Sequence, residues 1–364
     1  MPDSAPDPWT SRSPMPHLAI LDGWRGAAIL GVLFAHFLIS RPINLGRFGV
    51  ELFFVLSGRL MAEMLFRRRA SLPRFYARRF SRIYPALLVF VLAAWGLSAI
   101  VPRLTVDWRA ALSALTFTYN YYAQFAGHAP ELSHIWSLCI EEHVYALLGL
   151  IALASRRFAV PPMPLIFGLA LLAIIDGWVS TLLLHGNYYA VYWRTDARGA
   201  SILLGAGIWL LASGPLRPLL ALRMTTICFA AGIAAFVLNL NAVPDPVKYS
   251  AGTALLALSL ATVEAAPAAL GAVLRSRLFV AAGLASYSLY LWQQVFVKLA
   301  WNIPSRLAFL APAVCIGLGS FLLVEQPARR WLNAVIDRRI SRARAAAVSS
   351  DADGLPARSG SVAN

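Results

Sequence analysis

Residues 84–101 read YPALLVFVLAAWGLSAIV, an uncharged stretch about as long as the ~20 apolar residues with which a helix crosses a bilayer. Directly before it, residues 67–82 contain seven Arg. Further apolar stretches of similar length occur along the chain, with Arg gathered between them. This alternation is typical of a helical protein that crosses the membrane several times.

The composition of the chain agrees with that interpretation. Of its 364 residues, 59% are apolar and 13% are charged, and the mean hydropathy is +0.64. A soluble fold could not cover its surface with so few charges, and the same values exclude a disordered chain, a coiled coil and a disulfide scaffold. The cysteines, Cys139, Cys228 and Cys315, lie in apolar stretches and show no disulfide framework or metal-ligand spacing. We therefore predict an all-α, polytopic integral membrane protein.

Hydropathy predicts about ten transmembrane helices. Their expected positions are residues 18–40, 48–66, 84–101, 136–155, 163–185, 196–213, 224–242, 249–266, 280–300 and 306–324. The net charge of +15 arises from 30 Arg and 2 Lys against 17 acidic residues. With the N-terminus inside, 21 basic residues fall in inner segments and six in outer ones. Because an excess of Lys and Arg marks the cytoplasmic side, both termini are predicted to be cytoplasmic, and the charge requires no nucleic-acid partner.

The remaining segments are expected to be short. Residues 1–17 predict a cytoplasmic tail, since they lack the apolar core of a signal peptide. Residues 109–126 are apolar enough to span, but spanning there would place most later Arg outside, so we predict a helix at the outer interface. The pattern after Pro327 predicts an amphipathic helix on the inner membrane surface. Segment 333–364 would contain the end of that helix and, from residue 345, a disordered tail.

Ionisable residues inside predicted spans are costly and usually functional. Arg25 and His36 are eleven residues apart in the first span, which places them on one helix face about 16 Å apart along the axis. An imidazole titrates near neutrality and is suited to act as a general base. The alternative is a His that is satisfied by a carbonyl and an Arg that snorkels. Glu325 ends the last span, where its charge opposes the helix dipole, so we expect it to pair with Arg25.

Two further groups of charged residues are candidates for binding. Pro73 suits a helix start, and the residues that follow it predict one cationic face, made of Arg74, Arg78 and Arg82 at every fourth position with Arg79 beside them. Such a face suits the phosphates of an anionic cofactor, or it serves as a topology signal that contacts anionic lipid. On the outer side, Trp136 precedes the adjacent Glu141 and Glu142, of which at most one is expected to face a central cavity, and Arg198 opens the sixth predicted span.

Six sequence motifs, in order along the chain, resemble those of the acyltransferase 3 family. They are LDGWRG at 21–26 with His36, GVELFFVLSG at 49–58, RFYARRFSRIYP at 74–85, WSLCIEE at 136–142, SYSLYLW at 286–292 and SFLLVEQP at 320–327. The resemblance covers residues 18–332, which we take as the transmembrane domain. One such motif alone would be weak, whereas six in order are specific.

The resemblance implies an integral-membrane O-acyltransferase of the bacterial inner membrane that takes an acyl group, expected to be acetyl, from cytoplasmic acyl-CoA. The acceptor would be a hydroxyl of an envelope polysaccharide or of a lipid-linked sugar precursor. Membrane lipids would be the other partners, and no metal is expected. The expected catalytic residues are His36, Arg25 and Glu325. CoA contacts are expected from Arg79, Arg82 and Arg78, and acceptor contacts from Glu141, Glu142, Trp136 and Arg198.

The chain departs from the common family pattern at three places, one of which is Arg59, where many members have Phe or Tyr. Gln293 and Gln294 follow SYSLYLW where many members have His, and His143 with Val144 stands where many have Gln and Phe. The difference at Gln293 leaves His36 as the only intramembrane base that the sequence predicts. Two alternatives stay open, namely acylation of a small secondary metabolite such as a macrolide, and a transporter, for which charged residues along a pore are also typical. A transporter would often show inverted repeats, and none is found in the sequence.

Overall fold

The computed structural model describes residues 16–38, 42–185, 188–221, 223–300 and 306–353. Regular structure in these residues is helical and includes no sheet. Five helices are long and apolar enough to cross a membrane, and they cover Ala19–Phe37, Leu72–Ser98, Ile135–Phe158, Pro162–Leu183 and Arg306–Ser341. The chain is therefore an all-α, multi-pass membrane protein.

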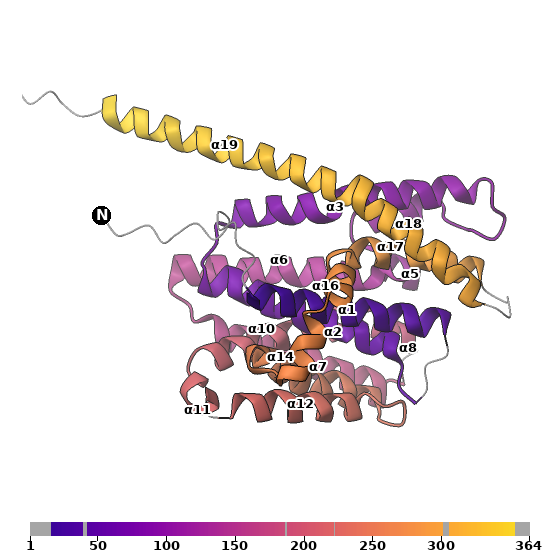
Figure 1. Cartoon of the computed structure of the whole chain (residues 1–364), viewed down its shortest axis with the longest axis horizontal. Helices are drawn as coiled ribbons and strands as arrows, with labels where there is room; N and C mark the ends of the chain where they lie inside the picture. Colours follow the sequence, from indigo (N-terminus) through magenta and orange to yellow (C-terminus); the bar gives the residue numbers. More distant parts are fainter. Residues whose placement is uncertain (1–15, 39–41, 186–187, 222, 301–305, 354–364) are drawn as a thin grey trace, which may run out of the picture.

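The helices form one bundle, from which α19 projects at one end (Figure 1). The longer helices are α1 Pro16–Phe37, α2 Leu45–Ala62, α3 Leu72–Ser98, α6 Ile135–Phe158, α7 Pro162–Trp178, α10 Ala200–Ser213, α12 Met224–Leu238, α17 Ser286–Leu299, α18 Leu310–Ser320 and α19 Gln326–Asp353. The shorter helices are α4 Trp108–Leu115, α5 Tyr119–Phe125, α8 Tyr188–Tyr192, α9 Thr195–Arg198, α11 Arg217–Ala221, α13 Asp245–Val247, α14 Thr253–Ala261, α15 Ala268–Leu274 and α16 Arg277–Leu284. Neither α4 nor α5 is long enough to cross a bilayer.

Glycines allow the central helices to approach closely. A Cβ atom at Gly58 of α2 would lie 2.0 Å from the carbonyl oxygen of Ile202 in α10. A Cβ atom at Gly26 of α1 would lie 1.9 Å from the carbonyl oxygen of Phe279 in α16. Small residues at such crossings are the usual means by which transmembrane helices pack, because no hydrophobic effect drives helices together inside lipid. These contacts hold α1 and α2 at the centre of the bundle.

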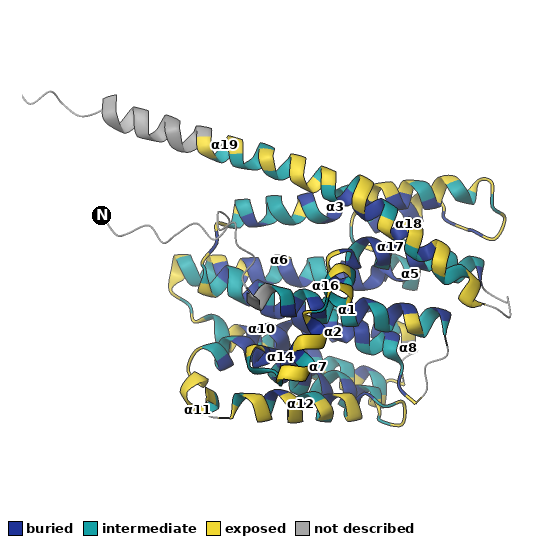
Figure 2. Cartoon of the chain, in the orientation of Figure 1, coloured by how far each residue is buried: buried dark blue, intermediate teal, exposed yellow. Residues whose placement is uncertain are grey.

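Exposed residues, drawn in yellow, lie along the outer faces of several helices (Figure 2), and many of them are large and apolar. Leu171 and Leu172 of α7, Phe229 and Ile233 of α12, and Ile316 of α18 are all exposed. Large exposed apolar surfaces mark contact with another apolar phase. These faces are therefore the ones that would meet the lipid.

The Arg-rich segment 67–82 contains the start of a helix, as predicted from Pro73. Helix α3 begins at Leu72, with Pro73 in its first turn, and continues through Pro85 to Ser98. This helix is continuous with the span that was expected to begin only at residue 84. The Tyr76 hydroxyl donates to the Tyr145 carbonyl at 2.9 Å, so the first turns of α3 lie beside the middle of α6. Arg residues of these turns consequently reach groups inside the bundle.

The end of the chain also differs from the prediction. Helix α18 continues through a π-type turn at Phe321–Glu325 into α19, so Pro327 does not separate a span from a surface helix. Local π-type turns are one way in which membrane helices tolerate Pro. Residues 345–353 are helical, whereas disorder was expected there. The predicted tails at 1–15 and 354–364 lie outside the described residues.

Candidate active site

A cavity of about 800 Å³ lies between α1, α2, α6, α8 and α17. Aromatic side chains form much of its wall, and these are Trp136, Tyr189, Tyr192, Trp193 and Tyr290. His36 of α1 and His134, which directly precedes α6, also line the cavity. Ligand pockets are commonly largely apolar with a few polar groups that orient the ligand. The cavity is therefore the candidate active site, and it contains the histidine that the sequence singled out.

His36 is held by an amide side chain on a distant helix. Its Nδ1 atom lies 2.6 Å from Oε1 of Gln293, which is buried on α17. The Nε2 atom of Gln293 donates to Oε1 of Gln294 at 3.4 Å, and Nε2 of Gln294 donates to the Pro130 carbonyl at 3.1 Å. Gln293 thus occupies the place in the sequence where many family members have His, and it contacts the predicted base directly.

The chain of amides determines which nitrogen of His36 carries the proton. A backbone carbonyl can only accept, so Gln294 must turn its NH₂ group toward Pro130 and its oxygen toward Gln293. Gln293 must then donate to Gln294 and turn its own oxygen toward His36. Nδ1 of His36 is therefore the donor, and Nε2 keeps the lone pair. A Cβ atom at Gly46 would lie 3.9 Å from Nε2, so the absence of a side chain there leaves space beside the basic nitrogen.

The expected ion pair between Arg25 and Glu325 is not formed, which corrects the sequence prediction. Arg25 donates to the Ser286 hydroxyl at 3.2 Å, and the Ser288 hydroxyl donates to Glu325 at 2.6 Å. Both serines belong to α17, so this helix provides the partner for each charged group. Arg25 still interacts electrostatically with Glu325 at longer range. The sequence therefore predicted correctly that Arg25 and Glu325 lie near one another, but the two side chains are not in contact.

Three guanidinium groups gather near Glu325. Arg82 interacts electrostatically with Arg25 and Arg329, and all three interact with the carboxylates of Asp22 and Glu325. Within the part of the chain that the structure describes, Arg82 makes no hydrogen bond or ion pair. Like charges are held together at a cost unless an anion joins them, and guanidinium groups suit phosphate. Arg329 was not among the predicted site residues, although its position four residues after Glu325 could have suggested it.

Arg79 is bound by the two adjacent acids of α6. Its Nε atom donates to Glu142 at 2.7 Å, and its Nη2 atom donates to Glu141 at 3.2 Å. The guanidinium group lies 3.6 Å from the centre of the Tyr145 ring, and the Ser57 hydroxyl donates to Glu141 at 3.3 Å. Both acids therefore face the same Arg, whereas the sequence suggested that they would point different ways. A forked guanidinium group reaches two carboxylates that a helix alone would separate.

Arg78, the third residue predicted to contact CoA, lies at the contact between α3 and α19. It donates to Asp337 of α19 at 2.7 Å, and Arg74 donates to the same carboxylate at 3.2 Å. The Ser81 hydroxyl donates to Asn333 at 2.8 Å. This side of α3 therefore positions α19.

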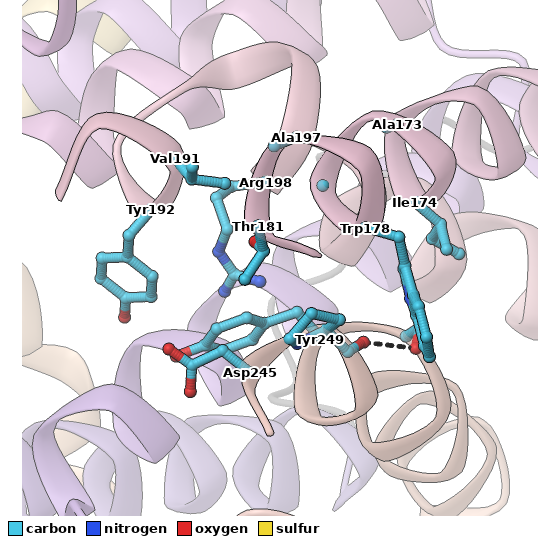
Figure 3. Close-up of a pocket in the computed structure, with 13 residues that line it drawn as sticks. Ala173, Ile174, Trp178, Thr181, Val191, Tyr192, Ala197, Arg198, Asp245 and Tyr249 are labelled. Atoms are coloured by element: carbon cyan, nitrogen blue, oxygen red, sulfur yellow. Dashed lines mark hydrogen bonds between the residues drawn. The ribbon is translucent and has the colours of Figure 1, made fainter. Parts of the chain in front are cut away.

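The residues predicted to contact the acceptor do not share one cavity. Trp136 lines the large cavity and contacts the Tyr192 ring, with ring centres 4.7 Å apart. Arg198 instead lines a smaller cavity of about 150 Å³ (Figure 3). It forms a buried ion pair with Glu51, a residue that the prediction left out. Glu141 and Glu142 line neither of these two cavities.

His134 is a second buried histidine that the sequence reasoning missed. Its side chain is 4% exposed, and neither ring nitrogen makes a hydrogen bond of normal geometry within the described residues. The ring meets Phe90 and Tyr290 edge to face, with centres 5.4 and 5.1 Å away. The sequence could have indicated a role for His134, because it lies two residues before Trp136 of the WSLCIEE motif. Since His134 and His36 line one cavity, the site contains two imidazoles, of which His134 is buried and His36 is half-buried.

The fold and the site together define a multi-pass membrane protein with an oriented, half-buried histidine in an aromatic cavity. The acyltransferase domain of the acyltransferase 3 family matches residues 18–325, so the chain belongs to this family. This confirms the resemblance that the six motifs suggested. No solved structure matches the chain.

Two relatives illustrate the similarity. Peptidoglycan O-acetyltransferase OatA of Listeria monocytogenes serovar 1/2a is 26% identical over 358 residues, which cover 88% of this chain and 57% of the relative. O-acetyltransferase OatA of Staphylococcus aureus strain NCTC 8325 / PS 47 is 32% identical over 215 residues, which cover 53% of this chain and 35% of the relative. The chain thus matches only part of each relative's length.

Proposed function

We propose that the protein transfers an acyl group, expected to be acetyl, from acyl-CoA to a hydroxyl of an envelope polysaccharide or of a lipid-linked sugar precursor. The observation that carries this proposal is His36, which presents a lone pair on Nε2 inside an aromatic cavity. Similarity to a peptidoglycan O-acetyltransferase supports an envelope glycan as the acceptor. The inner membrane of a bacterium would be the location of this reaction.

The proposed chemistry is direct transfer. His36 Nε2 removes the proton from the acceptor hydroxyl while its oxygen attacks the thioester carbonyl. A C–O bond forms, the C–S bond breaks, and the imidazolium returns the proton to the departing thiolate. Gln293 keeps the base in the required tautomer by accepting from Nδ1. No covalent acyl-enzyme is needed for this sequence of steps.

The donor would bind at the guanidinium cluster of Arg25, Arg82 and Arg329. Among the described residues, these three cations share only two nearby carboxylates, those of Asp22 and Glu325, whereas Arg79 alone is bound by two. Arg25 and His36 are about 16 Å apart along α1. In CoA the long pantetheine arm separates the phosphates from the thioester, so the phosphates and the reacting carbon would lie at these two levels. Arg78, which contacts α19, would support the cluster only indirectly.

The proposed activity predicts a change in the composition of the envelope. Deleting the gene should remove an acyl ester from one glycan, and the intact gene should restore it. Mass spectrometry of purified envelope glycans from the two strains, before and after mild alkaline treatment, measures the ester. Glycan acylation that is unchanged in the deletion strain would contradict the proposed acceptor class.

We also propose a topology of ten spans with both termini in the cytoplasm. The Arg156 guanidinium donates to the Leu65 carbonyl at 2.8 Å, which joins two turns that the Arg distribution predicts to be inside. At the other end, the backbone N–H of Asn241 donates to the Pro42 carbonyl at 3.0 Å, which joins two turns predicted to be outside. These contacts group the turns as the proposed topology requires.

Cysteine labelling in intact cells tests this topology. In a background without Cys139, Cys228 and Cys315, a Cys at the exposed Ser71 should resist an impermeant thiol reagent, because it would face the cytoplasm. A Cys at the exposed Ala242 should react, because it would face outward. The reverse labelling pattern would invert the topology, and both positions should react once the cells are made permeable.

A further inference from the structure

The smaller cavity, which Arg198 lines, has room for one substituent of a ligand. It lies between α7, the α8–α9 segment and the α13 region, and Figure 3 shows Tyr192, Arg198, Tyr249 and Trp178 around it. Its volume of about 150 Å³ equals that of an apolar protein cavity that holds benzene. Most of its remaining wall is aliphatic, with Ala173 and Ile174 among the lining residues. It therefore suits a compact, partly apolar group.

Arg198 brings unused hydrogen-bond donors into this cavity. Its side chain is 2% exposed, and its Nη2 atom is engaged by Glu51. Its Nε and Nη1 atoms have no partner within the described residues. Buried donors without acceptors cost about 1–3 kcal/mol each, and such groups in native proteins call for an explanation. A ligand oxygen in the cavity would provide the missing acceptor.

The charges around the cavity favour a neutral ligand. Glu51 compensates the charge of Arg198. Asp245 lies at the wall and is paired with Lys248 at 2.9 Å and with Arg47 at 3.9 Å. Arg198 is the one cation among the described residues that line the cavity, and Glu51 already pairs with it, so a carbonyl oxygen suits Arg198 better than a carboxylate or a phosphate. A lipid chain would fill the apolar space but would leave the Arg198 donors unsatisfied.

The cavity also lies next to the candidate active site. Tyr192 lines both cavities, and its ring packs on Trp136 of the larger one. A ligand in the large cavity would therefore need only to extend past Tyr192 to place a substituent beside Arg198.

We propose that the small cavity holds the acylamino substituent of an N-acylated sugar in the acceptor. The substituent's carbonyl oxygen would accept from Arg198, and its methyl group would contact the aliphatic wall. This inference rests on the proposed function, because it names a feature of the acceptor that the acyltransferase would recognise. The cavity is then a specificity site and takes no part in the chemical step.

Gly177 offers a way to fill the cavity while leaving Arg198 and Glu51 intact. A Cβ atom at Gly177 would meet only the Ala197 Cβ within 4 Å, at 3.8 Å, so Gly177→Leu would extend into open cavity space. The matched control is Gly168→Leu on the same helix, where a Cβ atom would meet nothing within 4 Å. Substituting Arg198 itself is avoided, because the lone Glu51 would be stranded.

The purified protein is assayed with acetyl-CoA and two acceptors, an oligomer of N-acetylglucosamine and the glucose oligomer of the same linkage. The wild type should prefer the N-acetylated oligomer by about 10- to 200-fold in kcat/KM, the range for one group in a fitted pocket. Gly177→Leu should reduce this ratio toward one, and Gly168→Leu should keep it. These results would support the inference.

Other outcomes would overturn it. A wild-type ratio near one, or a ratio that Gly177→Leu leaves unchanged, would remove the cavity from acceptor recognition while the acyltransferase stands. Preference for an oligomer of galacturonic acid over both acceptors would assign the cavity to a carboxylate instead. Failure to acylate any glycan, while acetyl-CoA still binds, would overturn the proposed function and this inference with it.

Discussion

His36→Ala is expected to lower the rate of acyl transfer by about 10²–10⁴-fold, the usual contribution of a general base. The reason is the free lone pair on Nε2, which the Gln293 contact leaves available to the acceptor hydroxyl. Folding should hold, because removing a neutral imidazole strands no charged partner. The measurement is acyl transfer per mole of monodisperse protein after size-exclusion chromatography, with acetyl-CoA and a glycan acceptor.

A companion variant separates a base from a merely buried histidine. Gln293→Leu removes the acceptor for Nδ1, so the imidazole is free to adopt the other tautomer, and the rate should fall between those of wild type and His36→Ala. In a His36→Ala background, Gln293→Leu should cause little further loss of rate, since Gln293 acts on the reaction only by orienting the His36 imidazole. A His36→Ala protein that transfers at nearly the wild-type rate would remove His36 from the chemistry, though not the chain from its family.

The class of the fold could be predicted from the sequence because it depends on summed properties. The length of an apolar run such as residues 84–101 indicates a membrane span, however the helices pack. An excess of Arg on alternate loops likewise indicates which side of the membrane each loop faces. The residues at which helices begin and end were harder to predict from the sequence. A helix was expected from Pro73, but its span was expected to begin only at residue 84, because the preceding Arg residues were placed in the cytoplasm. The Glu pair of α6 instead compensates Arg79 inside the bundle.

Side-chain partners could not be predicted, because they depend on how each helix is rotated and how deeply it is placed. Arg25 and Glu325 were expected to pair since they lie at similar depth, but α17 supplies a serine to each. Arg198 was assigned to the acceptor side without Glu51, its ion-pair partner 147 residues away in the chain. His134 went unnoticed because it precedes the predicted span by two residues. Contacts of this kind are set by tertiary packing.

The double variant Arg82→Ala/Arg329→Ala is expected to weaken CoA binding by at least about tenfold. A hydrogen bond to a charged group contributes about 1.5–3 kcal/mol, which corresponds to roughly 10- to 150-fold in affinity. Both residues belong to the guanidinium cluster near Glu325, and Arg82 makes no ion pair within the described residues. Titration calorimetry of the detergent-solubilised protein with CoA measures the dissociation constant directly.

Arg330→Ala is the matched control for the loss of charge. Arg330 is exposed and adjacent to Arg329 in the chain, but it contacts Gln326 of its own helix, so its removal should leave CoA affinity unchanged. The wild-type affinity should also fall as the salt concentration rises, because charge pairing with phosphates is screened, and the double variant should show a weaker salt dependence. Equal CoA affinity in the double variant and the wild type would reduce the cluster to a topology signal and would require the donor to bind elsewhere.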